Sequence, residues 1–120
     1  MGINSVLLVF LGGGIGSVLR FALSRLIIFG SNNLPWATLL SNTLASLILA
    51  FIVLEFKDTE KWASFYPLFV VGICGGFSTF STFSYENYQL LQQGQLTIFI
   101  INVLVSIFLG LLVFWLLARS

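Results

Sequence analysis

The chain has 120 residues, of which 58% are apolar and only 8% are charged, and its formal net charge is +1. Soluble domains place charge on about a quarter of their residues, so this composition predicts an integral membrane protein. A net charge of +1 offers no basic surface for nucleic acid. The single cysteine, Cys74, excludes an internal disulfide, and without any histidine it leaves no ligand set typical of a zinc or iron–sulfur cluster.

Four stretches of the sequence carry no charge, namely residues 1–19, 26–54, 62–85 and 87–118. Each is near or above the roughly 20 residues that a helix needs to cross about 30 Å of hydrocarbon. Four such helices use about 80 to 100 residues, which excludes a large catalytic or nucleotide-binding module. We therefore expect an all-α membrane protein that forms one four-helix domain over residues 1–120.

The first predicted span covers about Ser5 to Ile28 and carries Arg20 toward its end. An arginine at the membrane centre costs roughly 2.5 to 3.5 kcal/mol on insertion scales. Arg20 should therefore either extend to the interface or face an aqueous vestibule, where it would raise the local anion concentration. Gly12 and Gly16 form a GxxxG motif, which is typical of closely packed membrane helices.

The remaining spans follow from turn residues and charge. A turn at Gly30–Asn33, followed by Pro35 in the first turn of a helix, predicts a second span over about Leu34 to Phe56. The charged segment Glu55–Lys61 predicts a short aqueous loop. The later elements are a third span from about Trp62 to Glu86, a polar turn at Gln89–Gln95 and a fourth span from about Leu96 to Ala118.

Two short polar stripes match each other after a shift of 60 residues. Asn42 and Ser46 lie four residues apart in the second span, as Asn102 and Ser106 do in the fourth. Residues four apart share one helical face. Such a stripe either hydrogen-bonds a neighbouring helix or lines a pathway, and the match leaves an internal duplication open.

The third span contains an unusual segment, Gly72 to Ser84, in which a glycine pair precedes five hydroxyl residues in seven positions. This composition is poor for a continuous helix, so we expect a break. Non-helical backbone at membrane depth is tolerated only where protein or a water-filled path satisfies it, which predicts a binding or conduction site. A tight helix crossing is the alternative, because Gly72 and Gly76 repeat the GxxxG motif.

The phenylalanines of this segment recur every three residues, as do the hydroxyl residues between them. At about 3.0 residues per turn they would form separate aromatic and hydroxyl rows. Hydroxyls, the Asn42 amide, freed backbone N–H groups and the positive edges of phenylalanine rings could replace the water around a small anion. Freed carbonyls at the same break could instead hold a cation.

The charge distribution sets the membrane orientation only weakly. Lys57, Lys61 and Arg119 share a side with the N-terminus, against Arg25 and Arg20 on the other. A bias of three to two permits insertion in both directions, and therefore pairing with an inverted copy, as well as one fixed orientation.

The segment Gly75–Glu86 resembles the signature of the Fluc (CrcB) fluoride channels. The first-span segment Gly12–Arg20 and the second-span segment Thr38–Asn42 add matches in register. The resemblance extends over the whole length of the chain, including the fourth span. It implies a fluoride-specific ion channel, not an enzyme, that exports fluoride passively across the cell inner (plasma) membrane and relieves fluoride toxicity. It also implies a dual-topology antiparallel homodimer in the lipid bilayer.

The resemblance also implies roles for single residues. A structural Na⁺, which is not transported, would be held by the backbone carbonyls of Gly75 and Ser78. The implied fluoride pathway comprises Arg20, Thr38, Asn42, Phe80, Ser81, Thr82, Phe83 and Ser106.

The sequence departs from the family pattern in the fourth span. The family often carries a tyrosine and a further hydroxyl there, where this chain has Asn102 and Gly110. The alternative reading is a four-helix transporter of the small multidrug resistance type. Those proteins use a membrane-embedded glutamate in the first span, where this chain has Arg20.

Overall fold

The computed structural model describes residues 2–27 and 34–119, and all regular structure within them is helical. Four helical spans in this part of the chain are long and apolar enough to cross a membrane. They cover Ile3–Leu26, Trp36–Phe56, Trp62–Gln92 and Leu96–Arg119. The expectation of an all-α protein with four membrane spans is therefore confirmed.

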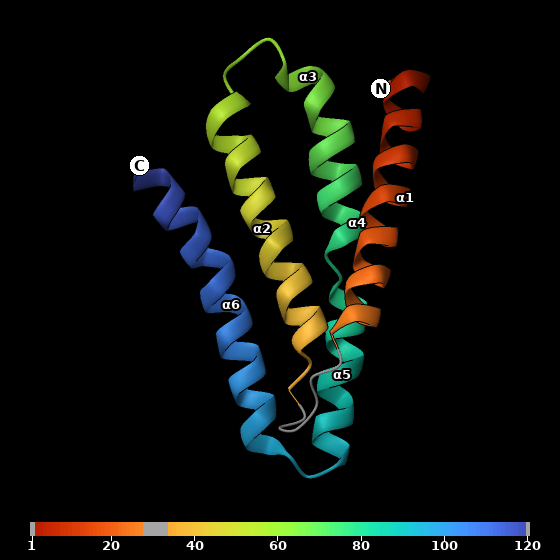
Figure 1. Cartoon of the computed structure of the whole chain (residues 1–120). Coiled ribbons are helices and arrows are strands. Elements are labelled where there is room, and N and C mark those ends of the chain that lie inside the picture. Colours follow the sequence, from red (N-terminus) through yellow and green to blue (C-terminus); the bar gives the residue numbers. More distant parts are fainter. Residues whose placement is uncertain (1, 28–33, 120) are drawn as a thin grey trace.

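The spans run side by side along the long axis of the molecule (Figure 1), and both chain ends lie at the same end as the α2–α3 connection. The first, second and fourth spans are single helices, α1 (Ile3–Leu26), α2 (Trp36–Phe56) and α6 (Leu96–Arg119). The third consists of α3 (Trp62–Phe65), the π-helical segment η1 (Tyr66–Cys74), α4 (Gly75–Phe77) and α5 (Phe80–Gln92). Helix α1 packs along η1 and α4, and α2 packs along α6.

Glycines allow α1 to cross the third span at backbone contact. A Cβ atom on Gly72 would lie 2.8 Å from the Cα of Gly12, and one on Gly76 would lie 2.6 Å from the carbonyl oxygen of Gly13. Both distances are shorter than a real side chain tolerates, so the two GxxxG motifs pack against each other as the sequence predicts. This crossing fixes η1 and α4, and hence the position of the break that follows α4.

The third span is interrupted at Ser78 and Thr79, which confirms the predicted break. Ser78 has φ −89° and ψ 160°, and Thr79 has φ −153° and ψ 125°, so both are extended. The hydroxyl of Thr79 then accepts a hydrogen bond from the Thr82 N–H at 3.1 Å and caps α5. Because this cap starts a regular α-helix, the expected rows at 3.0 residues per turn are wrong.

The third span also extends further than the sequence predicts, since α5 continues to Gln92 and only residues 93–95 form the turn to α6. Glutamine is a good helix former, and Gln89 and Gln92 donate to the hydroxyls of Tyr85 and Tyr88 one turn earlier. Gly94, with φ +72°, supplies the left-handed residue that ends the turn.

The other element boundaries differ by a few residues. Helix α1 begins at Ile3, and α2 begins directly after Pro35 instead of enclosing it. Glu55 belongs to α2, so residues 57–61 form the loop to α3. The predicted turn at Gly30–Asn33 and the predicted end of the first span at Ile28 lie outside the described residues.

The glycine crossing predicts the effect of adding one methyl group. We expect Gly76→Ala to lower the free energy of unfolding by about 1–3 kcal/mol or more, because its Cβ meets the backbone of α1. Gly14→Ala is the matched control, since nothing lies within 4 Å of its Cβ position. Unfolding of both purified variants in detergent would be compared with that of the parent chain, and equal stability would contradict the tight crossing.

Candidate functional site

The side chain of Asn42 binds the backbone of the third span at its break. Its Oδ1 accepts a hydrogen bond from the Thr79 N–H at 2.8 Å, and its Nδ2 donates to the Thr79 carbonyl at 3.3 Å. Both groups would otherwise be unsatisfied at membrane depth, where such groups are costly. The amide of Asn42 on α2 therefore replaces the helical hydrogen bonds that the break removes.

Two carbonyl groups lose their usual helical donors at the same place. In a continuous helix the carbonyls of Gly75 and Ser78 would accept from the N–H groups of Thr79 and Thr82. Those two N–H groups donate instead to Asn42 Oδ1 and to the Thr79 hydroxyl. Gly75 and Ser78 also line a small cavity of about 150 Å³ beside α2. Carbonyl oxygens freed in this way suit a hard cation.

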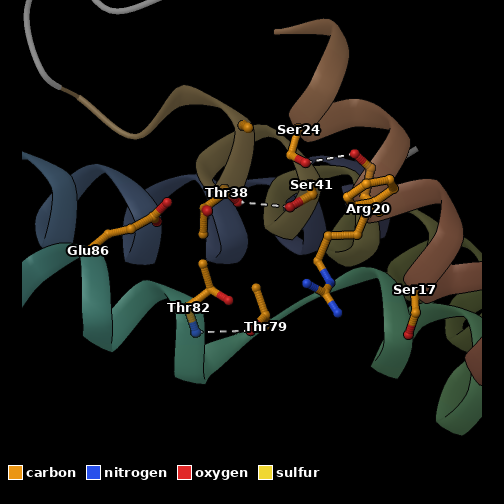
Figure 2. A pocket seen from close by; sticks show the side chains of 10 residues that line it. Ser17, Arg20, Ser24, Thr38, Ser41, Thr79, Thr82 and Glu86 are labelled. Atoms are coloured by element: carbon orange, nitrogen blue, oxygen red, sulfur yellow. Dashed lines mark hydrogen bonds between the residues drawn. The ribbon is translucent and has the colours of Figure 1, made fainter. Parts of the chain in front are cut away.

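A polar cavity of about 330 Å³ lies between α1, α2 and α5, and we call it the arginine cavity (Figure 2). Nε of Arg20 donates to the Gly76 carbonyl at 3.0 Å, at the end of α4. This bond leaves the other guanidinium donors of Arg20 available. The cavity is lined by Ser17, Arg20, Phe21, Ser24, Ala37, Thr38, Ser41, Thr79, Thr82 and Glu86.

Glu86 extends this polar region toward the α5–α6 turn. Its side chain lies near Thr38, away from Arg20 (Figure 2), and it also lines a polar cavity of about 220 Å³ with Pro35, Gln89 and Gln93. Its Oε1 atom is buried and has no hydrogen-bond partner among the described residues. Polar groups thus follow α5 from the break to its end.

A second cavity, of about 500 Å³, lies on the other side of the break, between α2, α5 and α6. We call it the phenylalanine cavity, because the rings of Phe80 and Phe83 lie on its wall with centroids 6.1 Å apart. Ser106 adds a buried hydroxyl that has no partner among the described residues. The lining residues are Leu39, Asn42, Thr43, Ser46, Ser78, Thr79, Phe80, Phe83, Val103, Ser106 and Ile107.

The structure divides the predicted pathway residues between the two cavities. Arg20, Thr38 and Thr82 line the arginine cavity, whereas Asn42, Phe80, Phe83 and Ser106 line the phenylalanine cavity. Ser81 lines neither; it is exposed, and its hydroxyl lies 3.3 Å from that of Thr79.

Thr79 lines both cavities, and the sequence analysis did not single it out. It was one of several similar hydroxyl residues in the segment. Only the extended conformation at the break distinguishes Thr79 from Thr82, and no local sequence pattern reveals which hydroxyl residue adopts it.

Four spans, a broken third span and a cavity on each side of the break define a small multi-pass membrane protein. Residues 7–117 match the family model described as CrcB-like protein, Camphor Resistance (CrcB). The chain belongs to the CrcB family. It is a multi-pass protein of the plasma membrane.

Curated relatives match almost the whole chain. A protein of Flavobacterium psychrophilum named fluoride-specific ion channel FluC is 38% identical over 116 residues, covering 93% of this chain and 92% of the relative. Proteins of the same name from Phocaeicola vulgatus and Pyrococcus abyssi are 39% and 36% identical. These alignments cover 91% and 89% of this chain, and 91% and 87% of the two relatives.

Proposed function

We propose that the chain is a fluoride channel that lets fluoride leave the cytoplasm down its own gradient. The observation that carries this proposal is the pair of cavities that share Thr79 as a lining residue, one rich in polar side chains and one lined by phenylalanines together with Asn42 and Ser106. Relatives in the same family are named fluoride-specific ion channels. Hydrogen fluoride crosses bilayers and ionises in a neutral cytoplasm, so a passive pore suffices to remove the trapped ion. No nucleotide-binding or catalytic group is required for such transport.

The arginine cavity supplies the vestibule of the proposed channel. The guanidinium of Arg20 gives this cavity a positive charge at membrane depth, held in place by its bond to the Gly76 carbonyl. A fixed cation in a low-dielectric cavity raises the local concentration of anions. Serine and threonine hydroxyls around it, among them Thr38 and Thr82, supply further donors.

The phenylalanine cavity supplies the part of the proposed path in which fluoride loses its water. Fluoride holds its water tightly, and donors must replace that water as the ion enters. Asn42 uses one amide hydrogen on Thr79 and keeps a second, and Ser106 has a hydroxyl without a partner among the described residues. The positive ring edges of Phe80 and Phe83 complete a neutral donor set that does not trap the ion.

The transporter of the small multidrug resistance type is not favoured by any observation. That reading requires a carboxylate in the first span, and Ile3–Leu26 contains no aspartate or glutamate.

Efflux from liposomes tests the proposed function directly. Vesicles that contain purified protein and potassium fluoride should release fluoride to an ion-selective electrode once valinomycin balances the charge. Vesicles loaded with potassium chloride should retain their chloride under the same conditions. Fluoride retention equal to that of protein-free vesicles would contradict a fluoride channel, and release that requires a proton gradient would indicate a coupled transporter.

We also propose that a structural Na⁺ binds at the carbonyls of Gly75 and Ser78. Support comes from the two N–H groups that are diverted to Asn42 and to the Thr79 hydroxyl, which leave these carbonyls without their helical donors. Both carbonyls belong to exposed or half-buried residues beside the small cavity, so a second subunit could add further oxygens. Bound there, Na⁺ would neutralise the carbonyl dipoles at the break.

The Na⁺ dependence of fluoride efflux shows whether the backbone carbonyl or the side chain of Ser78 binds the ion. The Ser78 hydroxyl donates to the Cys74 carbonyl at 2.8 Å, so it already has a partner within the helix. We expect fluoride efflux to require Na⁺ without moving it, and Ser78→Ala to keep that requirement. If Ser78→Ala abolished the Na⁺ dependence of efflux while the protein stayed folded, the side chain would be the ligand and the carbonyl assignment would be wrong.

The working unit that we propose is an antiparallel dimer of two identical chains. Phe80 is 79% exposed although it lines the phenylalanine cavity, so this wall is open on the outer surface of one chain. An inverted copy would cover it, and the weak three-to-two charge bias permits insertion in both directions.

Labelling tests this topology. A single cysteine introduced at Asp58 or Thr59, in the exposed loop between α2 and α3, should react with a membrane-impermeant maleimide from both sides of the membrane. The native Cys74 is buried, so labelling of the parent chain gives the background signal. Reaction from one side only would rule out dual topology.

Isoleucine replacements distinguish two roles of Phe80 and Phe83, namely contact of their ring edges with fluoride and simple apolar packing. Volume-similar apolar replacements usually cost under about 1.5 kcal/mol of stability, so Phe80→Ile and Phe83→Ile should fold. Because an aliphatic side chain has no positive edge, we expect efflux at least about tenfold slower, equivalent to about 1.4 kcal/mol on the barrier. Phe51→Ile on α2, outside both cavities, is the control. Unchanged efflux in both Phe80→Ile and Phe83→Ile would contradict the aromatic role, and only the hydroxyl and amide groups would remain as donors to fluoride.

A further inference from the structure

The segment η1, between α3 and α4 in the third span (Figure 1), is a π-helix of nine residues. In a π-helix each N–H bonds to the carbonyl five residues earlier, so a turn holds more residues than a turn of an α-helix. Such helices are rare and usually mark a functional site. Regular spacing precedes η1, where the Tyr66 N–H donates to the Trp62 carbonyl. It returns after η1, where the Ser78 N–H donates to the Cys74 carbonyl at 3.0 Å.

Pro67, the second residue of η1, accounts for the wider helix. Its side chain is buried. In an α-helix the proline ring would clash with the Ala63 carbonyl, and the missing N–H would leave that carbonyl without its donor. A wider turn moves the carbonyl away from the ring. The other proline of the chain, Pro35, directly precedes α2, where neither problem arises.

The wider turns keep two rows of residues on their partners. Four residues advance about 400° in an α-helix, so a row of residues four apart drifts by about 40° with every step. Turns that hold more residues offset this drift. The row that meets the glycines of α1 comprises Leu68, Gly72 and Gly76. The row that lines the small cavity beside α2 comprises Val70, Cys74 and Ser78. The third span therefore reaches its break with one face on α1 and another on α2.

Contacts at both ends of this stretch fix its rotation. Before Pro67, the ring of Phe65 packs edge-on against that of Phe56 at the end of α2, with centroids 4.9 Å apart. After η1, Asn42 of α2 accepts from the Thr79 N–H at 2.8 Å. An α-helix with the same number of residues between these contacts would turn further. It would rotate Thr79 away from Asn42, so the number of residues and the type of helix must match.

We propose that Pro67 is a positioning residue for the break. By holding η1 in the wider form, it sets the rotation at which the carbonyls of Gly75 and Ser78 lie beside α2. This inference rests on the proposed Na⁺ site and channel for its functional consequence, whereas the rotation itself is measurable through stability. The simpler alternative is that Pro67 only bends the span, as prolines in helices commonly do. The two differ in what happens when one residue is removed from η1.

A deletion and a replacement, made singly and together, test the proposal. Deleting Val71, whose side chain is 42% exposed, removes the additional residue that the wider helix holds. Because Pro67 still opposes an α-helix, we expect a lower unfolding temperature, loss of its rise with Na⁺, and fluoride efflux at least about tenfold slower. Adding Pro67→Ala permits an α-helix with the correct rotation. It should restore all three properties, with efflux within about twofold of the parent.

The gain must be specific to the shortened η1. In the parent chain Pro67→Ala should not raise the unfolding temperature, and an equal gain in both backgrounds would overturn the proposal. Deletion of Val105, in the regular helix α6, is the matched control that Pro67→Ala should not rescue. Failure of Pro67→Ala to restore the Val71 deletion, rescue of both deletions, or a Val71 deletion as stable as the parent would each overturn the positioning role.

Failure of the proposed function would give a different result. A parent chain that releases no fluoride would contradict the channel, and a parent chain whose unfolding temperature does not rise with Na⁺ would contradict the cation site. In either case the unfolding temperatures of the four chains would still decide the role of Pro67.

Discussion

The two-way hydrogen bond between the Asn42 amide and the backbone of Thr79 is the interaction on which the rest of the structure depends. A membrane has no water to satisfy an interrupted helix, so the break at Ser78 and Thr79 requires a partner at the same depth. Asn42 provides one from α2. Because Asn42 takes the Thr79 N–H, the carbonyl of Gly75 loses its helical donor, and Thr79 is held extended between the two cavities. The break, the freed Gly75 carbonyl and the position of Thr79 between the two cavities therefore depend on one side chain.

The glycine crossing sets where this break occurs. Gly12 and Gly16 bring α1 into backbone contact with Gly72 and Gly76, directly before Phe77. Arg20 then reaches the Gly76 carbonyl from the next turn of α1, which places a cation at the end of α4 where carbonyl groups are exposed. The GxxxG motifs therefore pack α1 against the third span, as the sequence predicts. Close packing positions the charged group of the cavity.

Much of this architecture could be predicted from the sequence because it depends on composition and local pattern. Four uncharged stretches predicted four spans, and the glycine and hydroxyl segment predicted the break. What the sequence could not predict depends on side chains from different spans. The Thr79 cap made α5 an ordinary α-helix, so Thr82 faces the arginine cavity while Phe80 and Phe83 face the other one. A buried hydrogen bond from Asn102 to Asn87 joins residues on two helices, and only Asn102 belonged to a visible pattern.

The central claim is that Asn42 holds the break in the form that frees the carbonyls, and it can be tested without any measurement of flux. Na⁺ that binds the folded chain raises its unfolding temperature by mass action. We would measure that rise for Asn42→Leu and for Thr43→Val, whose native hydroxyl donates only within α2, to the Leu39 carbonyl at 2.7 Å. The rise should persist in Thr43→Val and disappear in Asn42→Leu, because the Thr79 N–H can then return to the Gly75 carbonyl. Equal rises in the two variants would contradict the claim.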